Sequence, residues 1–138
     1  MLYDNKYELL HQVLQLLEEE KIELAKEKIN ESIEEGLYNI LSHLIYGVFR
    51  WELIPDERNN DLSFEILHYQ NLIKTLKELL IKEQDIGSKW SKCYKLAILW
   101  IKEDLEIDPG EEFGDDELEI IRVLITKDNI LNKEYRYS

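Results

Sequence analysis

A long apolar repeat constrains the fold more than any other feature of this sequence. Apolar residues recur at steps of three and four and pass Gly36 without a change of phase, at Ile22, Ala25, Ile29, Ile33, Leu37, Ile40, Leu41, Leu44, Val48 and Trp51. This spacing is typical of one face of an α-helix. Pro55 disfavours helical geometry at Ile54 and ends the run. We therefore predict one helix from about Ile22 to Leu53, with a kink allowed at Gly36. Two helices that meet at Gly36 are the alternative.

Four further segments have helical spacing of apolar residues. They are Lys6–Glu19 after the capping residue Asn5, a helix capped by Asp61 and ending near Lys82, a helix from Ser88 to about Leu105, and a short helix from Asp116 to about Thr126. Residues 84–87 are predicted to form a turn. Leu118–Ile125 is rich in Ile and Val and also fits a strand, but a single strand lacks a partner to pair with.

The length and composition indicate one ordinary domain. A chain of 138 residues with only 5 glycines and 2 prolines leaves little room for long loops. We predict an all-α fold: a single-domain helical bundle of four main helices, one of them long, plus a short C-terminal helix. The bundle is expected to cover residues 1–128, and residues 129–138 to form a loose tail.

The charge of the chain bears on its partners and location. The net charge is −13, which disfavours nucleic acid and anionic membranes because both are polyanions. Residues 1–61 carry −8, residues 62–102 carry +3 and residues 103–138 carry −8. The central excess of lysine either attracts acidic neighbours or forms a cationic surface that binds an anion. With no signal peptide, no apolar run that spans a membrane and one cysteine, we expect a cytoplasmic protein.

Two Glu-x-x-His pairs have the spacing of ligands in di-iron helical bundles: Glu8 with His11, and Glu65 with His68. At about 100° per residue, Glu8 and His11 point away from the apolar side of their helix. Ligands of a bundle must point inward, so we do not predict a di-metal site.

Asp108–Glu119 has the length of a calcium-binding loop between two helices. Gly110 stands at a ligand position, however, and Phe113 stands where the sharp turn needs glycine. A solvated acidic loop is the preferred interpretation.

Carboxylates on two predicted helices resemble the acidic clusters with which all-helical nucleotide pyrophosphohydrolases hold magnesium. They are Glu27, Glu31, Glu34 and Glu35, with Glu103 and Asp104. Such a site requires side chains that face one cleft. Glu27, Glu31 and Glu34 lie beside or opposite the Ile29 and Ile33 face, so a metal-dependent hydrolase is only an alternative.

Nucleophilic chemistry has little support in this sequence. Cys93 falls on the apolar side of its helix and is interpreted as a core residue. His43 is interpreted as a packed or half-buried histidine rather than a general base. The three tryptophans are interpreted as core or helix-junction residues, at Trp51, Trp90 and Trp100. We predict no catalytic residue, no metal ligand and no cofactor.

The end of the long helix gathers an unusual set of residues. We predict a structural corner that also offers a surface for interaction, formed by Arg50, Trp51, Pro55, Asp56 and Arg58. The two arginines lie close in sequence to two acids and are expected to form ion pairs. A buried pair of this kind fixes geometry more than it adds stability.

This corner resembles a bacterial family known as domain of unknown function 29. Arg50-Trp51 matches a Lys-Trp pair of the family, and Pro55-Asp56-Glu57-Arg58 matches its Pro-Glu-x-Arg corner. Weaker matches follow along most of the chain, at Ile33-Glu34-Glu35, Ile66, Gln70, Ile73, Tyr94–Ala97, Phe113 and Asp116–Leu118. The resemblance implies an all-helical fold and no assigned activity.

Three positions depart from the family pattern. Gly47 stands where the family has a histidine, Ile54 replaces a glutamine and Leu62 replaces a tryptophan. Chemistry that depends on that histidine would be absent from this chain.

Negative charge without an assembled site favours a non-catalytic, acidic protein–protein interaction module. We expect a protein partner, basic in character, and leave a homodimer open. A narrower alternative is an antitoxin or immunity protein that masks a basic toxin or nuclease through electrostatic steering. The rival class is the metal-dependent nucleotide hydrolase.

Overall fold

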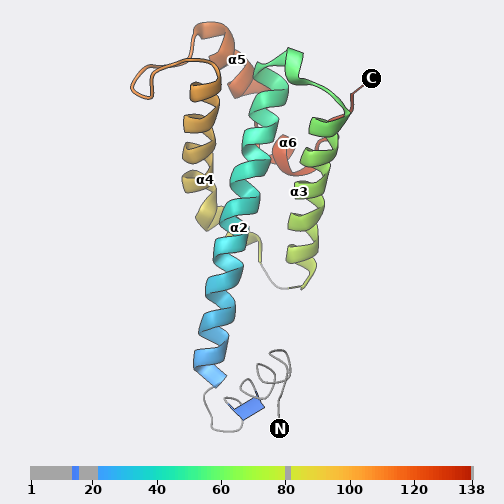
Figure 1. The fold of residues 1–138 in the computed structure, drawn as a ribbon, viewed down its shortest axis with the longest axis vertical. Coiled ribbons are helices and arrows are strands. Elements are labelled where there is room, and N and C mark those ends of the chain that lie inside the picture. Colours follow the sequence, from blue (N-terminus) through green and yellow to red (C-terminus); the bar gives the residue numbers. More distant parts are fainter. Residues whose placement is uncertain (1–13, 16–21, 80–81, 138) are drawn as a thin grey trace, which may run out of the picture. The chain divides into compact units, whose positions relative to one another are not determined.

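The computed structural model describes residues 14–15, 22–79 and 82–137. Within them the ordered elements are helices α2 Ile22–Leu53, α3 Asn60–Leu79, α4 Glu83–Asp104, α5 Asp115–Leu124 and α6 Lys127–Asn132, with a 3₁₀ turn, η1, at Pro55–Glu57 (Figure 1). No strand forms in this part of the chain, so the predicted all-α class is confirmed and residues 118–125 are not a strand. Apart from residues 14–15, the helix predicted at Lys6–Glu19 lies outside the described residues. None of the helices described is both long and apolar enough to cross a membrane.

The chain divides into two units, residues 1–36 and 37–138. This differs from the predicted division into 1–128 and 129–138. The boundary falls inside α2, which runs as one helix from Ile22 to Leu53 as predicted. In the first unit, Leu24 and Ile29 on α2 are exposed.

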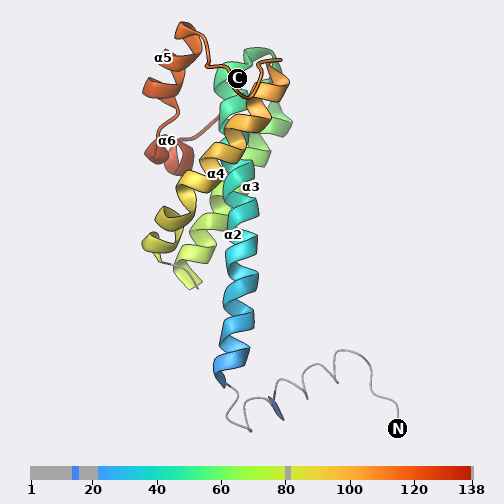
Figure 2. The same ribbon diagram turned by 90° about the vertical axis from the view of Figure 1, so that its left-hand side faces the viewer.

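The core of the second unit lies where the C-terminal part of α2 meets α3 and α4. In Figure 1, α2 runs between α3 and α4, and Figure 2 shows α5 above α6 on one side of the unit. The fully buried apolar residues of α2 recur at helical spacing, at Leu37, Leu41, Leu44, Ile45, Val48 and Phe49. The apolar repeat of the sequence is therefore the face that this helix buries.

The starts of α3 and α4 differ from the prediction. The Leu62 N–H donates to Asn59 Oδ1 at 2.8 Å, so Asn59 rather than Asp61 caps α3. Helix α4 begins at Glu83, so the turn predicted at residues 84–87 is wrong. Ile86 is 0% exposed, and its burial stabilises an extra helical turn that Gly87 and Ser88 disfavour locally.

The C-terminal residues are not a loose tail. The Asn129 N–H donates to Thr126 Oγ1 at 3.1 Å, which caps α6. Ile130, Leu131 and Tyr135 are buried. Tertiary contacts thus order a segment whose own periodicity is too short to predict a helix.

Candidate functional site

The residues of the predicted corner divide into a buried part and a surface part. Trp51 is 7% exposed, and its ring lies 6.1 Å from that of Tyr135 at 75°. Arg58 places its guanidinium 5.5 Å from the centre of the Trp51 ring and donates from Nε to the Trp51 carbonyl at 2.5 Å. Pro55 and Asp56 are exposed on η1. Trp51 and Arg58 therefore join the end of α2 to the chain that follows it.

A buried carboxylate lies beside this junction. The Glu52 side chain is 4% exposed, and its Oε1 lies 3.5 Å from Arg58 Nη2. Glu52 Oε2 and the Tyr135 hydroxyl are both buried without a hydrogen-bond partner. Burial, together with the charge of Glu52, raises the pKa of Tyr135. The phenol is thus held neutral in the folded protein.

Arg50 belongs to the surface part. Its Nε lies 3.2 Å from Glu57 Oε2, its Nη1 lies 3.8 Å from Glu65 Oε2, and its guanidinium lies 5.5 Å from the centre of the Tyr46 ring. The side chain of Arg50 is only 24% exposed, so these contacts hold it in place along α2. It therefore joins η1 and α3 to the outward side of α2.

Four rings from three helices form a continuous surface, which we call the aromatic face: His43 and Tyr46 of α2, Tyr69 of α3 and Trp100 of α4. His43 stacks on Trp100, with centroids 5.1 Å apart at 29°, and on Tyr69, at 5.9 Å and 14°. Tyr46 meets Trp100 edge-on at 5.4 Å and 71°. Such offset and edge contacts stabilise ring pairs beyond their burial.

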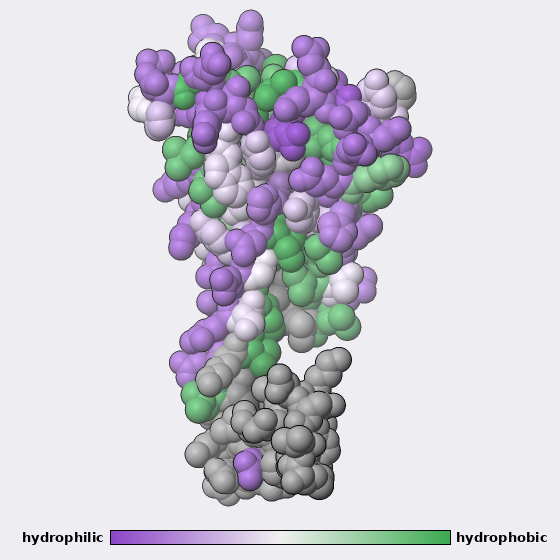
Figure 3. Space-filling view, viewed as in Figure 1, coloured by the Kyte–Doolittle hydropathy of each residue, from purple (hydrophilic) through white to green (hydrophobic). Residues whose placement is uncertain are grey.

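The aromatic face is anchored at Asp104 and remains open to solvent. The Tyr46 hydroxyl donates to Asp104 Oδ2. Burial and this carboxylate raise the pKa of Tyr46. His43 is exposed, and Tyr46, Tyr69 and Trp100 are half-buried. In the view of Figure 1, a pale area of intermediate hydropathy covers the upper part of α2 and α4 among hydrophilic atoms (Figure 3).

Sequence reasoning missed this surface. Trp100 lies at a junction of α2 and α4, one of the two positions predicted for it, but it is not in the core and also contributes to a solvent-accessible face. A signal exists in the sequence: His43, Tyr46 and Arg50 follow one another at helical spacing on α2, on the side away from Leu41, Leu44 and Val48. The positions of Tyr69 and Trp100 beside that row depend on helix packing.

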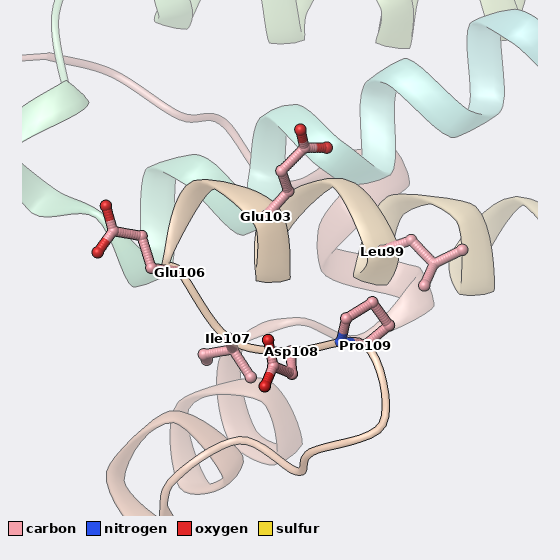
Figure 4. Close-up of a pocket in the computed structure, with 6 residues that line it drawn as sticks. All are labelled: Leu99, Glu103, Glu106, Ile107, Asp108 and Pro109. Carbon is pink, nitrogen blue, oxygen red and sulfur yellow. The ribbon is translucent and has the colours of Figure 1, made fainter.

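A pocket of about 470 Å³ opens where α4 ends, lined by Leu99, Glu103, Glu106, Ile107, Asp108 and Pro109 (Figure 4). Its carboxylates do not converge, because Glu103 points away from Asp108. Across the described part of the chain, no three His, Cys, Asp or Glu side chains are placed to hold a metal ion.

The loop after α4 is held by packing. Lys102 Nζ donates to the Glu111 carbonyl at 2.6 Å and lies 5.3 Å from the centre of the Phe113 ring. Phe113, the residue that departs from the calcium-loop pattern, is 9% exposed and contributes to the core.

The remaining candidates have structural surroundings. Cys93 is fully buried, as predicted, and its Sγ lies 3.6 Å from the Tyr38 carbonyl; burial raises the pKa of its thiol. In the second Glu-x-x-His pair, Glu65 forms an ion pair with Arg50 and His68 is exposed beside Tyr69. The first pair, Glu8 with His11, lies outside the described residues.

Gly47 is a point of close helix packing. A Cβ at this position would lie 3.2 Å from Ile66 Cγ1 and 4.0 Å from Leu62 Cδ1. The position where the resembled family carries a histidine therefore faces the apolar side of α3 in this chain, and a larger side chain would have to displace Ile66.

Comparison of this chain with protein-family models, with curated proteins and with solved structures gives no match.

Proposed function

We propose that this protein is a non-catalytic protein–protein interaction module whose binding surface is the aromatic face. The observation that carries the proposal is the gathering of His43, Tyr46, Tyr69 and Trp100 on one solvent-accessible surface beside Arg50. Tyr, Trp and Arg are the residues most enriched at the energetic centres of protein interfaces. Rings held by mutual stacking lose little conformational freedom when a partner binds.

The proposed partner is a basic protein in the cytoplasm. The net charge of −13 and the carboxylates of Glu57, Glu65 and Asp104 around the aromatic face support this choice, because complementary charge speeds and orients association. An antitoxin or immunity protein that masks a basic toxin or nuclease is the narrower form of the same proposal.

We also propose kinship with the family known as domain of unknown function 29. The contacts of Arg58 with Trp51 and of Arg50 with Glu57 support it, since these residues lie in the matching segment. For this chain and for that family we propose the same layout, a helical bundle in which the long helix packs on its neighbours.

Affinity capture from cells that express the chain tests the proposed function. We expect Trp100→Ala to lose at least about nine-tenths of a specific protein partner, because removing one central aromatic residue costs about 2 kcal/mol or more. Phe64→Ala is the matched control, since Phe64 is 65% exposed on α3 and has no ring contact with the aromatic face. Equal capture by both variants contradicts the proposal. So does the absence of a specific partner together with hydrolysis of a nucleotide panel in the presence of magnesium.

A further inference from the structure

The three tryptophans of the chain differ in what covers their rings. Arg58 lies 5.5 Å from the centre of the Trp51 ring, and Lys127 Nζ lies 5.4 Å from that of Trp90. Within the described residues, no lysine or arginine lies over Trp100. Trp100 instead has His43 stacked on it and Tyr46 at its edge, and it stays half-buried.

A carboxylate with unused capacity lies next to this ring. The Tyr46 ring contacts Trp100, and its hydroxyl donates to Asp104 Oδ2. In the described part of the chain, nothing donates a hydrogen bond to Asp104 Oδ1. An ionised carboxylate accepts several hydrogen bonds, so Asp104 can accept a further donor without losing Tyr46.

The charges around the aromatic face favour a cation. Asp104, Glu57 and Glu65 carry three negative charges and Arg50 carries one positive charge, which is engaged with both glutamates. The local balance is therefore negative. A planar guanidinium both stacks on an aromatic ring and donates to a carboxylate, whereas an ammonium is more strongly hydrated and lacks a stacking plane.

We propose that the aromatic face binds an arginine side chain of the partner protein, with its guanidinium over the Trp100 ring and its N–H groups directed at Asp104. This assignment rests on the proposed function and names the chemistry that the partner supplies. The partner's arginine would then lie over Trp100 as Arg58 of this chain lies over Trp51.

Nuclear magnetic resonance of the tryptophan indole N–H groups tests the arginine site directly. The full chain gives one such signal for each of Trp51, Trp90 and Trp100, and Trp100→Phe assigns the third. The probes are end-capped peptides of three arginines, three lysines or three glutamates at matched ionic strength. We expect the arginine peptide to shift the Trp100 signal saturably. We expect the lysine peptide to bind about threefold more weakly, and the glutamate peptide to leave the signal unchanged.

Asp104→Asn provides the matched variant, because its amide oxygen still accepts from Tyr46 while its charge is gone. We expect this variant to bind the arginine peptide about two- to fivefold more weakly, in line with one partly exposed ion pair. Phe64→Ala should bind it as the wild type does.

An unmoved Trp100 signal overturns the arginine assignment, and so does a response to lysine equal to that to arginine. Loss of partner capture in Trp100→Ala together with an unmoved signal means that the proposed function stands and the arginine chemistry is wrong. Undiminished capture by Trp100→Ala contradicts the proposed function, whatever the peptides do.

Discussion

Gln70 of α3 donates its side-chain amide to the backbone carbonyl of Lys133, at 2.9 Å, and to that of Ile130, at 3.0 Å. Gln70 is only 4% exposed, so this amide is committed to the C-terminal segment rather than to water. The Ser63 hydroxyl on the same helix donates to the Tyr135 carbonyl. Residues 130–135 are therefore attached along α3, and Ile130, Leu131 and Tyr135 of this segment belong to the core.

Gln70→Ala should destabilise the protein by about 2–3 kcal/mol, because it leaves two backbone carbonyls without their buried donor. Urea unfolding followed by circular dichroism gives the free energy of unfolding. Asn71→Ala is the matched control, since Asn71 is its exposed neighbour in α3 and should change stability by less than about 0.5 kcal/mol. Equal effects of the two substitutions would show that the C-terminal attachment does not depend on Gln70.

Alanine at the two helical glycines of α2 should have opposite effects. Nothing lies within 4 Å of a Cβ at Gly36, so Gly36→Ala should gain about 1 kcal/mol of helix stability. At Gly47 the added carbon would lie 3.2 Å from Ile66 Cγ1, and we expect a net loss of about 1 kcal/mol from overpacking. Helix content and thermal unfolding by circular dichroism measure both. A gain at Gly47 would mean that Ile66 yields readily.

Glu106 adopts a left-handed backbone conformation, with φ of 58°, directly after the end of α4. A non-glycine residue costs about 1 kcal/mol in this region, so Glu106→Gly should stabilise the protein by about that amount. Glu106→Ala is the control, because it removes the carboxylate and keeps the backbone cost. If both substitutions stabilise equally, relief of charge repulsion among the acidic residues is the cause and the backbone is not.

Stability should fall at alkaline pH. Burial, with neighbouring carboxylates, raises the pKa of Tyr46 and Tyr135 above the value of about 10 found in unfolded chains. Above pH ~10 the unfolded chain therefore releases protons that the folded chain keeps, and the free energy of unfolding falls as pH rises. The stabilising effect is complete below that pH. Urea unfolding over a series of alkaline pH values measures the decline.

Tyr135→Phe isolates the contribution of one phenol. It should make the alkaline decline shallower and leave stability at neutral pH unchanged or higher, because it removes a buried hydroxyl that has no partner. Tyr137→Phe, at an exposed tyrosine, is the matched control. If the free energy of unfolding of Tyr135→Phe fell with pH as steeply as that of the wild type, the Tyr135 phenol would not contribute to the alkaline decline.

Helical spacing allowed the bounds of α2 to be predicted, because one apolar face runs unbroken from Ile22 and Pro55 stops it. The same reasoning failed at the start of α4, because the burial of Ile86 in the core depends on tertiary packing and cannot be read from local helix propensity. It failed again at α6, whose six residues are too few to form a helix without tertiary contacts.

By itself, the sequence determined that the described chain is helical, where its longest helix begins and ends, and that it carries a strong negative charge. These properties are local or additive. Only the tertiary structure decided that His43, Tyr69 and Trp100 meet. They lie on three separate helices, and the rotation of each helix is set by which side chains it buries against the others, at Gly47, Ile66 and Ile101 among them.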